Sequence, residues 1–309
     1  MTASFDGIAP LPHLGVIRAE GEDAVKFLHG QLTHDFALLD VQHARLAAFL
    51  SAKGRMQASF VGFKRSPTEV LLVCSRDLLA PTLKRMSMFV MRAKAKLSDA
   101  SEEFLLYGLA GNAIITIAGK AIQISAKADL GNISVIGLAP AGAVARALWI
   151  APVGTPAPAG SPLPENLWAW GEVQSGVATL TAPLVDAFVP QMLNYESVGG
   201  VNFKKGCYPG QEVVARSQFR GTLKRRAFLV HSDQSLKAGD EVFQPGDDEQ
   251  PCGMVAQAAS VPAGLAASGF DAIVSLQISA AQASELHLGS PGGPRLSLLP
   301  LPYPLLEDI

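Results

Sequence analysis

The sequence predicts an α+β protein, because strand-like and helix-like segments follow one another without the strict alternation that a doubly wound parallel sheet requires. An apolar run at 16–21 reads as a strand, and a helical pattern follows it. Three strand-like runs at 45–50, 56–63 and 69–74, separated by short turns, then form a meander. Antiparallel sheets with helices on one face are therefore expected.

Two helices are predicted from the spacing of apolar residues. The first begins near Glu22 and Asp23, whose charge suits a helix N-terminus, and its apolar residues at 25, 28, 32 and 36 share one face. The second follows Ser75, a residue type that caps helices, with apolar residues at 79, 83, 86 and 90. The uncharged stretch 104–119 is too short to span a bilayer and contains glycines, so it predicts buried strands.

The second half of the chain divides at a proline-rich stretch. Residues 151–164, APVGTPAPAGSPLP, predict a loop or linker. Five short strand-like runs, separated by glycine and proline turns, predict a small closed β-barrel; they lie at 227–231, 241–244, 253–258, 271–278 and 295–299. We expect three parts: N-terminal α+β lobes at 1–150, a linker and cysteine-containing segment at 151–226 that returns to the N-terminal body, and a C-terminal barrel at 227–309.

Composition limits the classes of function. The 309 residues are 49% hydrophobic and 17% charged, with a formal net charge of −2, so a generally basic surface for nucleic acid is not expected. The N-terminus lacks the pattern of a secretory signal, which predicts a cytoplasmic protein without a membrane partner. Three cysteines without a C-x-x-C pair fit a reducing compartment and indicate no metal site.

The densest chemical signal lies at 204–226, where seven lysines or arginines accompany a single acid, Glu212. Gly206 and the pair Pro209-Gly210 place Cys207 in a tight turn. Lys204 and Lys205 would stabilise its thiolate, the reactive form. The alternatives are that Cys207 is a small buried residue and that the basic side chains form an ordinary solvated strand face.

The segment KKGCYPGQEVVARSQFRGTLKRR resembles the signature of the YgfZ family, which is related to the folate-dependent aminomethyltransferase of the glycine cleavage system. The resemblance extends to 170–176, 188–194, 21–35 and 49–55. It implies aminomethyltransferase-like lobes around a channel that binds tetrahydrofolate, followed by the barrel. It also implies a role in assembly or repair of iron–sulfur clusters, including those of tRNA-thiolating enzymes, with client or assembly proteins as partners.

The resemblance also assigns candidate site residues. Cys207 would be the functional thiol, and Glu172 matches the acidic residue that binds the pterin ring in the aminomethyltransferase; its alternative role is a surface carboxylate or a partner for an arginine. The remaining candidates would orient the thiol or contact the ligand, and the alternative is a hydrogen-bonded turn that holds the domains together. These candidates are Lys205, Gly206, Tyr208, Gln211, Glu212 and Arg216.

Three other functions compete with this one. A true aminomethyltransferase would carry an aspartate just after Gly54-Arg55, but residues 56–59 hold no carboxylate, and Cys74 replaces a pterin-binding asparagine. We therefore assign no enzymatic activity from the sequence. A thiol catalyst would need a histidine base, and none lies near Cys207 in the sequence. An RNA-binding module would need more aromatic residues than Tyr208 and Phe219 among the basic ones, so direct RNA binding is not expected.

Overall fold

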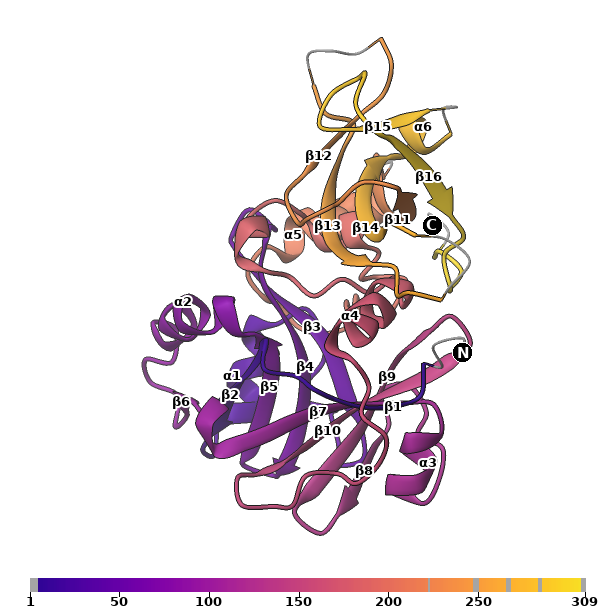
Figure 1. Cartoon of the computed structure of the whole chain (residues 1–309). Coiled ribbons are helices and arrows are strands. Elements are labelled where there is room, and N and C mark those ends of the chain that lie inside the picture. The colour runs from indigo at the N-terminus through magenta and orange to yellow at the C-terminus, as the bar shows by residue number, and fades with distance from the viewer. Residues whose placement is uncertain (1–4, 222, 247–249, 265–267, 283–284, 307–309) are drawn as a thin grey trace.

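Two antiparallel sheets form the N-terminal half of the protein, in a computed structural model that describes residues 5–221, 223–246, 250–264, 268–282 and 285–306 (Figure 1). The first sheet has the order β3 (Ala44–Leu50), β4 (Met56–Ser66), β5 (Glu69–Ser75), β2 (Leu14–Glu20) and β6 (Lys96–Asp99). The second has the order β1 (Gly7–Pro10), β7 (Phe104–Ala110), β10 (Val144–Pro152), β9 (Ile133–Ala141) and β8 (Lys127–Leu130). The predicted meander is β3-β4-β5, and the α+β class is confirmed.

The two sheets pack face to face because their strands alternate between two apolar faces. In β5, Leu71 and Val73 point to the second sheet and contact a core that includes Ile136 and Leu148. Leu72 of the same strand points the other way, into a core shared with the helices. The strand β5 is therefore buried on both sides.

Helices cover the outer faces of both sheets. The helices α1 (Ala24–Gln31) and α2 (Arg76–Ser87) lie on the first sheet, and α3 (Asn112–Ala118) lies on the second (Figure 1). Both predicted helices exist, but α1 ends at Gln31, because Leu32 is already extended. The prediction of strands throughout 104–119 is wrong after Ala110, where Gly111 adopts a φ of 60° and the chain turns into α3.

The C-terminal half contains the predicted closed barrel. Its strands, in spatial order, are β11 (Arg225–Ser232), β14 (Phe270–Gln277), β13 (Gly253–Ser260), β12 (Glu241–Phe243), β15 (Leu286–Leu288) and β16 (Arg295–Leu299). The short helix α6 (Ile278–Ala281) follows β14. Only β15 was absent from the prediction, since three residues are too few to show an alternating pattern.

Two further helices connect the halves. The helix α4 (Glu165–Gln174) lies between the sheets and the barrel, and α5 (Gln211–Phe219) follows the cysteine-containing turn (Figure 1). Part of the basic segment is therefore helical, at Gln211–Phe219, and does not form the solvated strand face that was the alternative. Asn194, with a φ of 57°, fixes this connection, because its side chain both accepts from the Ala227 N–H (3.1 Å) and donates to the Ala227 carbonyl (2.9 Å) at the start of the barrel.

Trp168 of α4 is packed against the second sheet at a glycine. A Cβ placed on Gly108 would lie 2.5 Å from the indole ring, which is closer than side chains approach one another. We predict that Gly108→Ala lowers the free energy of unfolding by about 1–3 kcal/mol, because Trp168 must shift within a filled core. Urea denaturation measures this loss. The matched control is Gly30→Ala, since a Cβ on Gly30 meets nothing within 4 Å and should cause no loss of stability; equal effects at both positions would contradict this packing.

Candidate functional site

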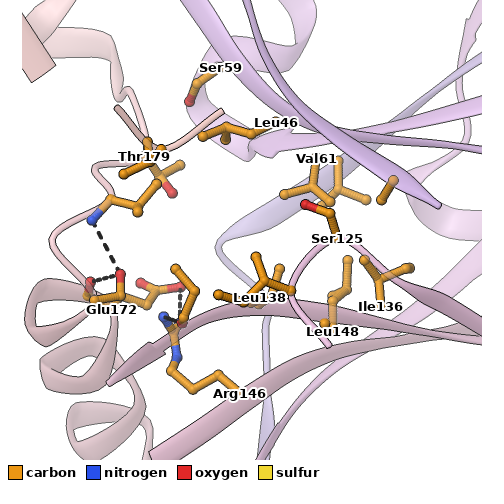
Figure 2. A pocket seen from close by; sticks show the side chains of 18 of the residues that line it. Leu46, Ser59, Val61, Ser125, Ile136, Leu138, Arg146, Leu148, Glu172 and Thr179 are labelled. Atoms are coloured by element: carbon orange, nitrogen blue, oxygen red, sulfur yellow. Dashed lines mark hydrogen bonds and ion pairs between the residues drawn. The ribbon is translucent and has the colours of Figure 1, made fainter. Parts of the chain in front are cut away.

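A cavity of about 420 Å³ lies between the two sheets next to α4. Its walls come from β3, β4 and β5 of one sheet, β9 and β10 of the other, α4, and the C-terminal segment at Pro302 and Tyr303. Most of the wall is apolar, with Leu46, Val61 and Leu148 among the contributing side chains (Figure 2). Its volume and its lining are those of a small-molecule site.

Glu172 is the acidic group of this cavity and lies at one end of it (Figure 2). The Trp168 indole N–H donates to Oε1 (3.0 Å), and the Gln257 amide donates to Oε2 (3.2 Å). Two cationic or titratable groups approach Oε1: His13 Nε2 at 3.6 Å and the Arg146 guanidinium at 3.8 Å. The carboxylate is therefore contacted from α4, β10, the barrel strand β13 and the segment before β2.

These contacts keep Glu172 ionised. Burial alone would raise the pKa of its carboxyl group, but His13, the charge of Arg146 and the Trp168 N–H together hold the pKa below its usual value. Conversely, Glu172 raises the pKa of His13, although burial of that imidazole acts in the opposite direction. The cavity thus presents a fixed negative charge in apolar surroundings.

Two arginines supply hydrogen-bond donors to the same cavity. Arg146 is 4% exposed, its guanidinium lies 4.4 Å from the centre of the Trp168 ring, and burial lowers its pKa to about 10. The Nε–H groups of Arg146 and of Arg45 are buried and have no hydrogen-bond partner among the described residues. Unsatisfied buried donors are costly, so both groups would gain from a ligand that brings an acceptor.

Glu172 also borders a second hollow, of about 540 Å³, whose lining includes His13, Arg76 and Lys237. The carboxylate therefore lies on the wall shared by the two hollows. The second hollow is lined on one side by the N-terminal half, at His13 and at residues 75–77, and on the other side by the barrel strand β13. A passage at this place would run between the N-terminal lobes and the barrel.

The cysteine-containing turn lies elsewhere, against the end of α1. Lys205 is 7% exposed, and its ammonium group donates to the carbonyls of His29 and of Leu32, the latter at 2.6 Å. It also lies 4.6 Å from the centre of the Tyr208 ring. Burial lowers the pKa of Lys205 to about 8. Cys207 is exposed, whereas Cys74 and Cys252 are buried, and burial raises the pKa of Cys74 to about 12.

The other residues of this segment are used for packing and local pairing. Tyr208 is buried in the core that joins the halves, and Glu212 pairs with Arg216 at 3.0 Å on the exposed side of α5. Gly210, with a φ of 78°, begins α5 at a point where a Cβ would lie 2.7 Å from the Cα of Gly54. The turn at Gly54 and the turn at Gly210 are thus in direct backbone contact.

The structure separates the predicted site residues into two groups. Glu172 lines the cavity, and none of the other candidates does so. Those candidates, which belong to the turn and to α5, are Lys205, Gly206, Cys207, Tyr208, Gln211, Glu212 and Arg216. Their contact with a ligand stays a prediction.

Sequence reasoning missed Arg146, Arg45 and Trp168. A signal for Arg146 was present, because it is the only charge in the apolar run VARALWIAP, and such a charge needs a partner when it is buried. Within the described ranges, no cluster of three or more His, Cys, Asp and Glu side chains is arranged to hold a metal ion. No helix in that part of the chain is long and apolar enough to cross a membrane.

The architecture defines the class of protein. The fold is that of the glycine cleavage system aminomethyltransferase T from Bartonella henselae, with a TM-score of 0.68 and 16% identity, covering 98% of this chain and 87% of that one. The fold predicted from the resemblance is therefore confirmed. No family model matches the chain.

Two sequence relatives carry the same family name. The tRNA-modifying protein YgfZ of Colwellia psychrerythraea is 29% identical over 244 residues, covering 75% of this chain and 74% of the relative. The tRNA-modifying protein YgfZ of Yersinia pestis is 26% identical over 313 residues, covering 95% and 91%. The chain is thus similar in sequence to YgfZ proteins over most of its length, in agreement with the resemblance of the segment 204–226.

The ionised state of Glu172 makes stability depend on pH. Because the pKa is below 4.5 in the folded protein, the ionised carboxylate stabilises the fold above about pH 4.5, and this contribution is lost as the pH falls through the folded pKa. We predict that Glu172→Gln destabilises the protein by about 1–3 kcal/mol at pH 5.5 and by progressively less toward pH 3. Urea denaturation at each pH measures the difference. The control Glu212→Gln alters an exposed pair and should change stability little at either pH; a difference for Glu172→Gln that does not vary with pH would contradict the assignment.

Proposed function

We propose that this chain is a cytoplasmic, tetrahydrofolate-binding accessory protein that assists assembly or repair of iron–sulfur clusters in enzymes, including tRNA-thiolating ones. In this proposal Glu172 binds the ligand and Cys207 is the functional thiol. The observation that carries it is the ionised Glu172 carboxylate at the end of an apolar cavity that also contains unsatisfied arginine N–H groups.

The residues of the cavity suit a pterin ring. The pyrimidine half of such a ring is planar, so the apolar walls from two facing sheets can enclose it. Its guanidine-like edge presents adjacent N–H groups, and a carboxylate can accept two of them. The ring also carries acceptor atoms. The Nε–H groups of Arg45 and Arg146 have no hydrogen-bond acceptor in the described structure, and these atoms could supply one. Glu172 would fix the orientation of the ring, and the arginines would complete its hydrogen bonds.

The alternative of aminomethyl transfer has less support from the same cavity. Among the described residues that line it, Glu172 is the only carboxylate, and it is already held by four neighbours. The aminomethyltransferase would have its aspartate within the segment that corresponds to residues 56–59. In this chain Ser59 belongs to that segment, and its hydroxyl already accepts the Leu180 N–H at 2.9 Å. No second acid is therefore positioned to assist the proton transfers of that reaction.

RNA binding through the basic segment also has little support, because several of its charges are used internally. Lys205 binds carbonyls of α1, and Arg216 pairs with Glu212. Arg225 donates to the Cys252 carbonyl at 2.9 Å, and Arg226, which is buried, donates to Glu196 at 2.6 Å. A segment in which these side chains are bound to carbonyls and carboxylates of the protein itself offers fewer cations to phosphate groups.

Binding of tetrahydrofolate tests the proposal directly. We predict that Glu172→Ala weakens binding by about 10- to 100-fold, because a charge-assisted pair of hydrogen bonds is lost. Isothermal titration calorimetry measures the affinity. Glu165→Ala removes another carboxylate of α4, one that does not line the cavity, and should leave affinity unchanged. Equal affinity for the wild type and Glu172→Ala would contradict the role of Glu172.

The role of the thiol is tested separately. We predict that Cys207→Ser fails to restore the activity of iron–sulfur enzymes in a strain that lacks the native protein, whereas the wild-type chain restores it. Since Cys207 does not line the cavity, Cys207→Ser should bind tetrahydrofolate as the wild type does, which controls for folding. Full restoration by Cys207→Ser would show that the thiol is not required.

A further inference from the structure

A cluster of apolar side chains lies on the surface where α2 ends. Met88, Phe89 and Met91 are 69%, 46% and 86% exposed, although each has a large apolar side chain. They belong to the connection from α2 to β6, which runs along the outer edge of the molecule (Figure 1). Single exposed apolar side chains are common on proteins, but three within four residues form a cluster, and such clusters mark binding surfaces.

The backbone of this connection turns the cluster outward. The Phe89 N–H donates to the Met86 carbonyl at 3.0 Å, which continues the last turn of α2. Met86 and Val90 point inward and pack in the core beneath α1 and α2. Met91 adopts a φ of 34°, in the left-handed region that residues other than glycine rarely occupy. A polar side chain or a glycine would suit such an exposed position better, so the needs of the fold do not explain the apolar residues.

Positive charges border the cluster. Lys84, Arg85 and Arg92 are exposed, and none of them forms an ion pair with another described residue. An acid that lies beside the following part of the connection is already paired, since Glu22 binds Lys94 at 2.8 Å. An apolar centre with a cationic border is complementary to a partner surface that has an apolar centre and a border of Asp and Glu side chains.

The composition of the cluster favours a protein partner over a second copy of the chain or a membrane. Two copies that met through this surface would bring like charges together, which costs free energy. Amphipathic membrane anchors carry broader faces of Trp, Phe and Leu with four or more basic residues, whereas one phenylalanine and three unpaired cations are present here. Three of the seven methionines of the chain lie at 86–91, and methionine is favoured on surfaces that accept several protein partners.

We infer that Met88, Phe89 and Met91, with the basic side chains beside them, form a docking surface for an acidic amphipathic segment of a protein partner. The apolar side of that segment would cover the three side chains, and its Asp and Glu residues would pair with Lys84, Arg85 and Arg92. The identity of the partners as iron–sulfur proteins rests on the proposed function, but the docking surface itself does not.

The docking surface and the turn that contains Cys207 are connected to opposite ends of α1. The Lys94 N–H donates to the side chain of Asp23, just before the helix, at 2.8 Å. Lys205 donates to the carbonyl of Leu32, just after the helix, at 2.6 Å. A helix of 8 residues is about 12 Å long, which is within the span of an ordinary protein–protein interface.

Photo-crosslinking in cells tests the inference on the full-length protein. Phe89 is replaced by benzoylphenylalanine, and the crosslinked peptides are identified by mass spectrometry. We expect crosslinks to segments of other proteins in which Asp and Glu flank apolar residues. Arg85→Glu combined with Arg92→Glu should lower the crosslinking yield about tenfold, because like charges then face each other. The matched control places benzoylphenylalanine at Ile115 of α3, which is also exposed, and should give no such crosslinks.

Crosslinks to a second copy of this chain, or equal yields from positions 89 and 115, would overturn the inference. A yield that the charge reversal leaves unchanged would overturn it too, and urea denaturation of that variant checks that it remains folded. Sedimentation with phosphatidylglycerol vesicles tests the membrane alternative: binding that Met88→Ser combined with Met91→Ser abolishes would assign the surface to lipid instead. Acidic partners unrelated to iron–sulfur enzymes would support the docking surface and contradict the proposed function.

Discussion

The buried carboxylate of Glu172 is the interaction on which the arrangement of the parts depends. A carboxylate in apolar surroundings is costly unless it is paired and hydrogen-bonded, and here its partners come from four separate elements. Trp168 belongs to α4, Arg146 to β10, Gln257 to the barrel and His13 to the segment before β2. Satisfying one charge therefore fixes α4 against both sheets and against the barrel. These contacts also hold the Glu172 carboxylate at the end of the cavity, where a ligand can reach it.

The cavity that contains Glu172 and the turn that contains Cys207 lie in different parts of the structure. The cavity is enclosed by the facing sheets, whereas the Cys207 turn lies against the end of α1, where Lys205 binds the His29 and Leu32 carbonyls. One apolar core connects them, since it contains both Tyr195, which lines the cavity, and Tyr208, which follows the thiol. The cavity and the exposed Cys207 are therefore joined through one core without sharing residues.

Sequence reasoning succeeded where the pattern is local. The strands of the meander and most barrel strands show alternation or turn residues at their ends, and the first two helices show clear spacing. It failed at α3, because a short apolar run has the same appearance in a buried strand and in a buried helix. Glu172 was recognised through its family resemblance only, since nothing in its neighbours reveals burial. The hydrogen bonds from Lys205 to the His29 and Leu32 carbonyls could not be predicted, because they depend on tertiary packing between distant segments.

We propose that tetrahydrofolate occupies the cavity beside Glu172. Hydrogen exchange of the native protein, with and without saturating tetrahydrofolate, tests it most directly. We expect slower exchange in peptides that cover 136–140 and 172–179, which line the cavity, and unchanged exchange at 204–208. Protection confined to 204–208, or no protection anywhere, would contradict this location of the ligand.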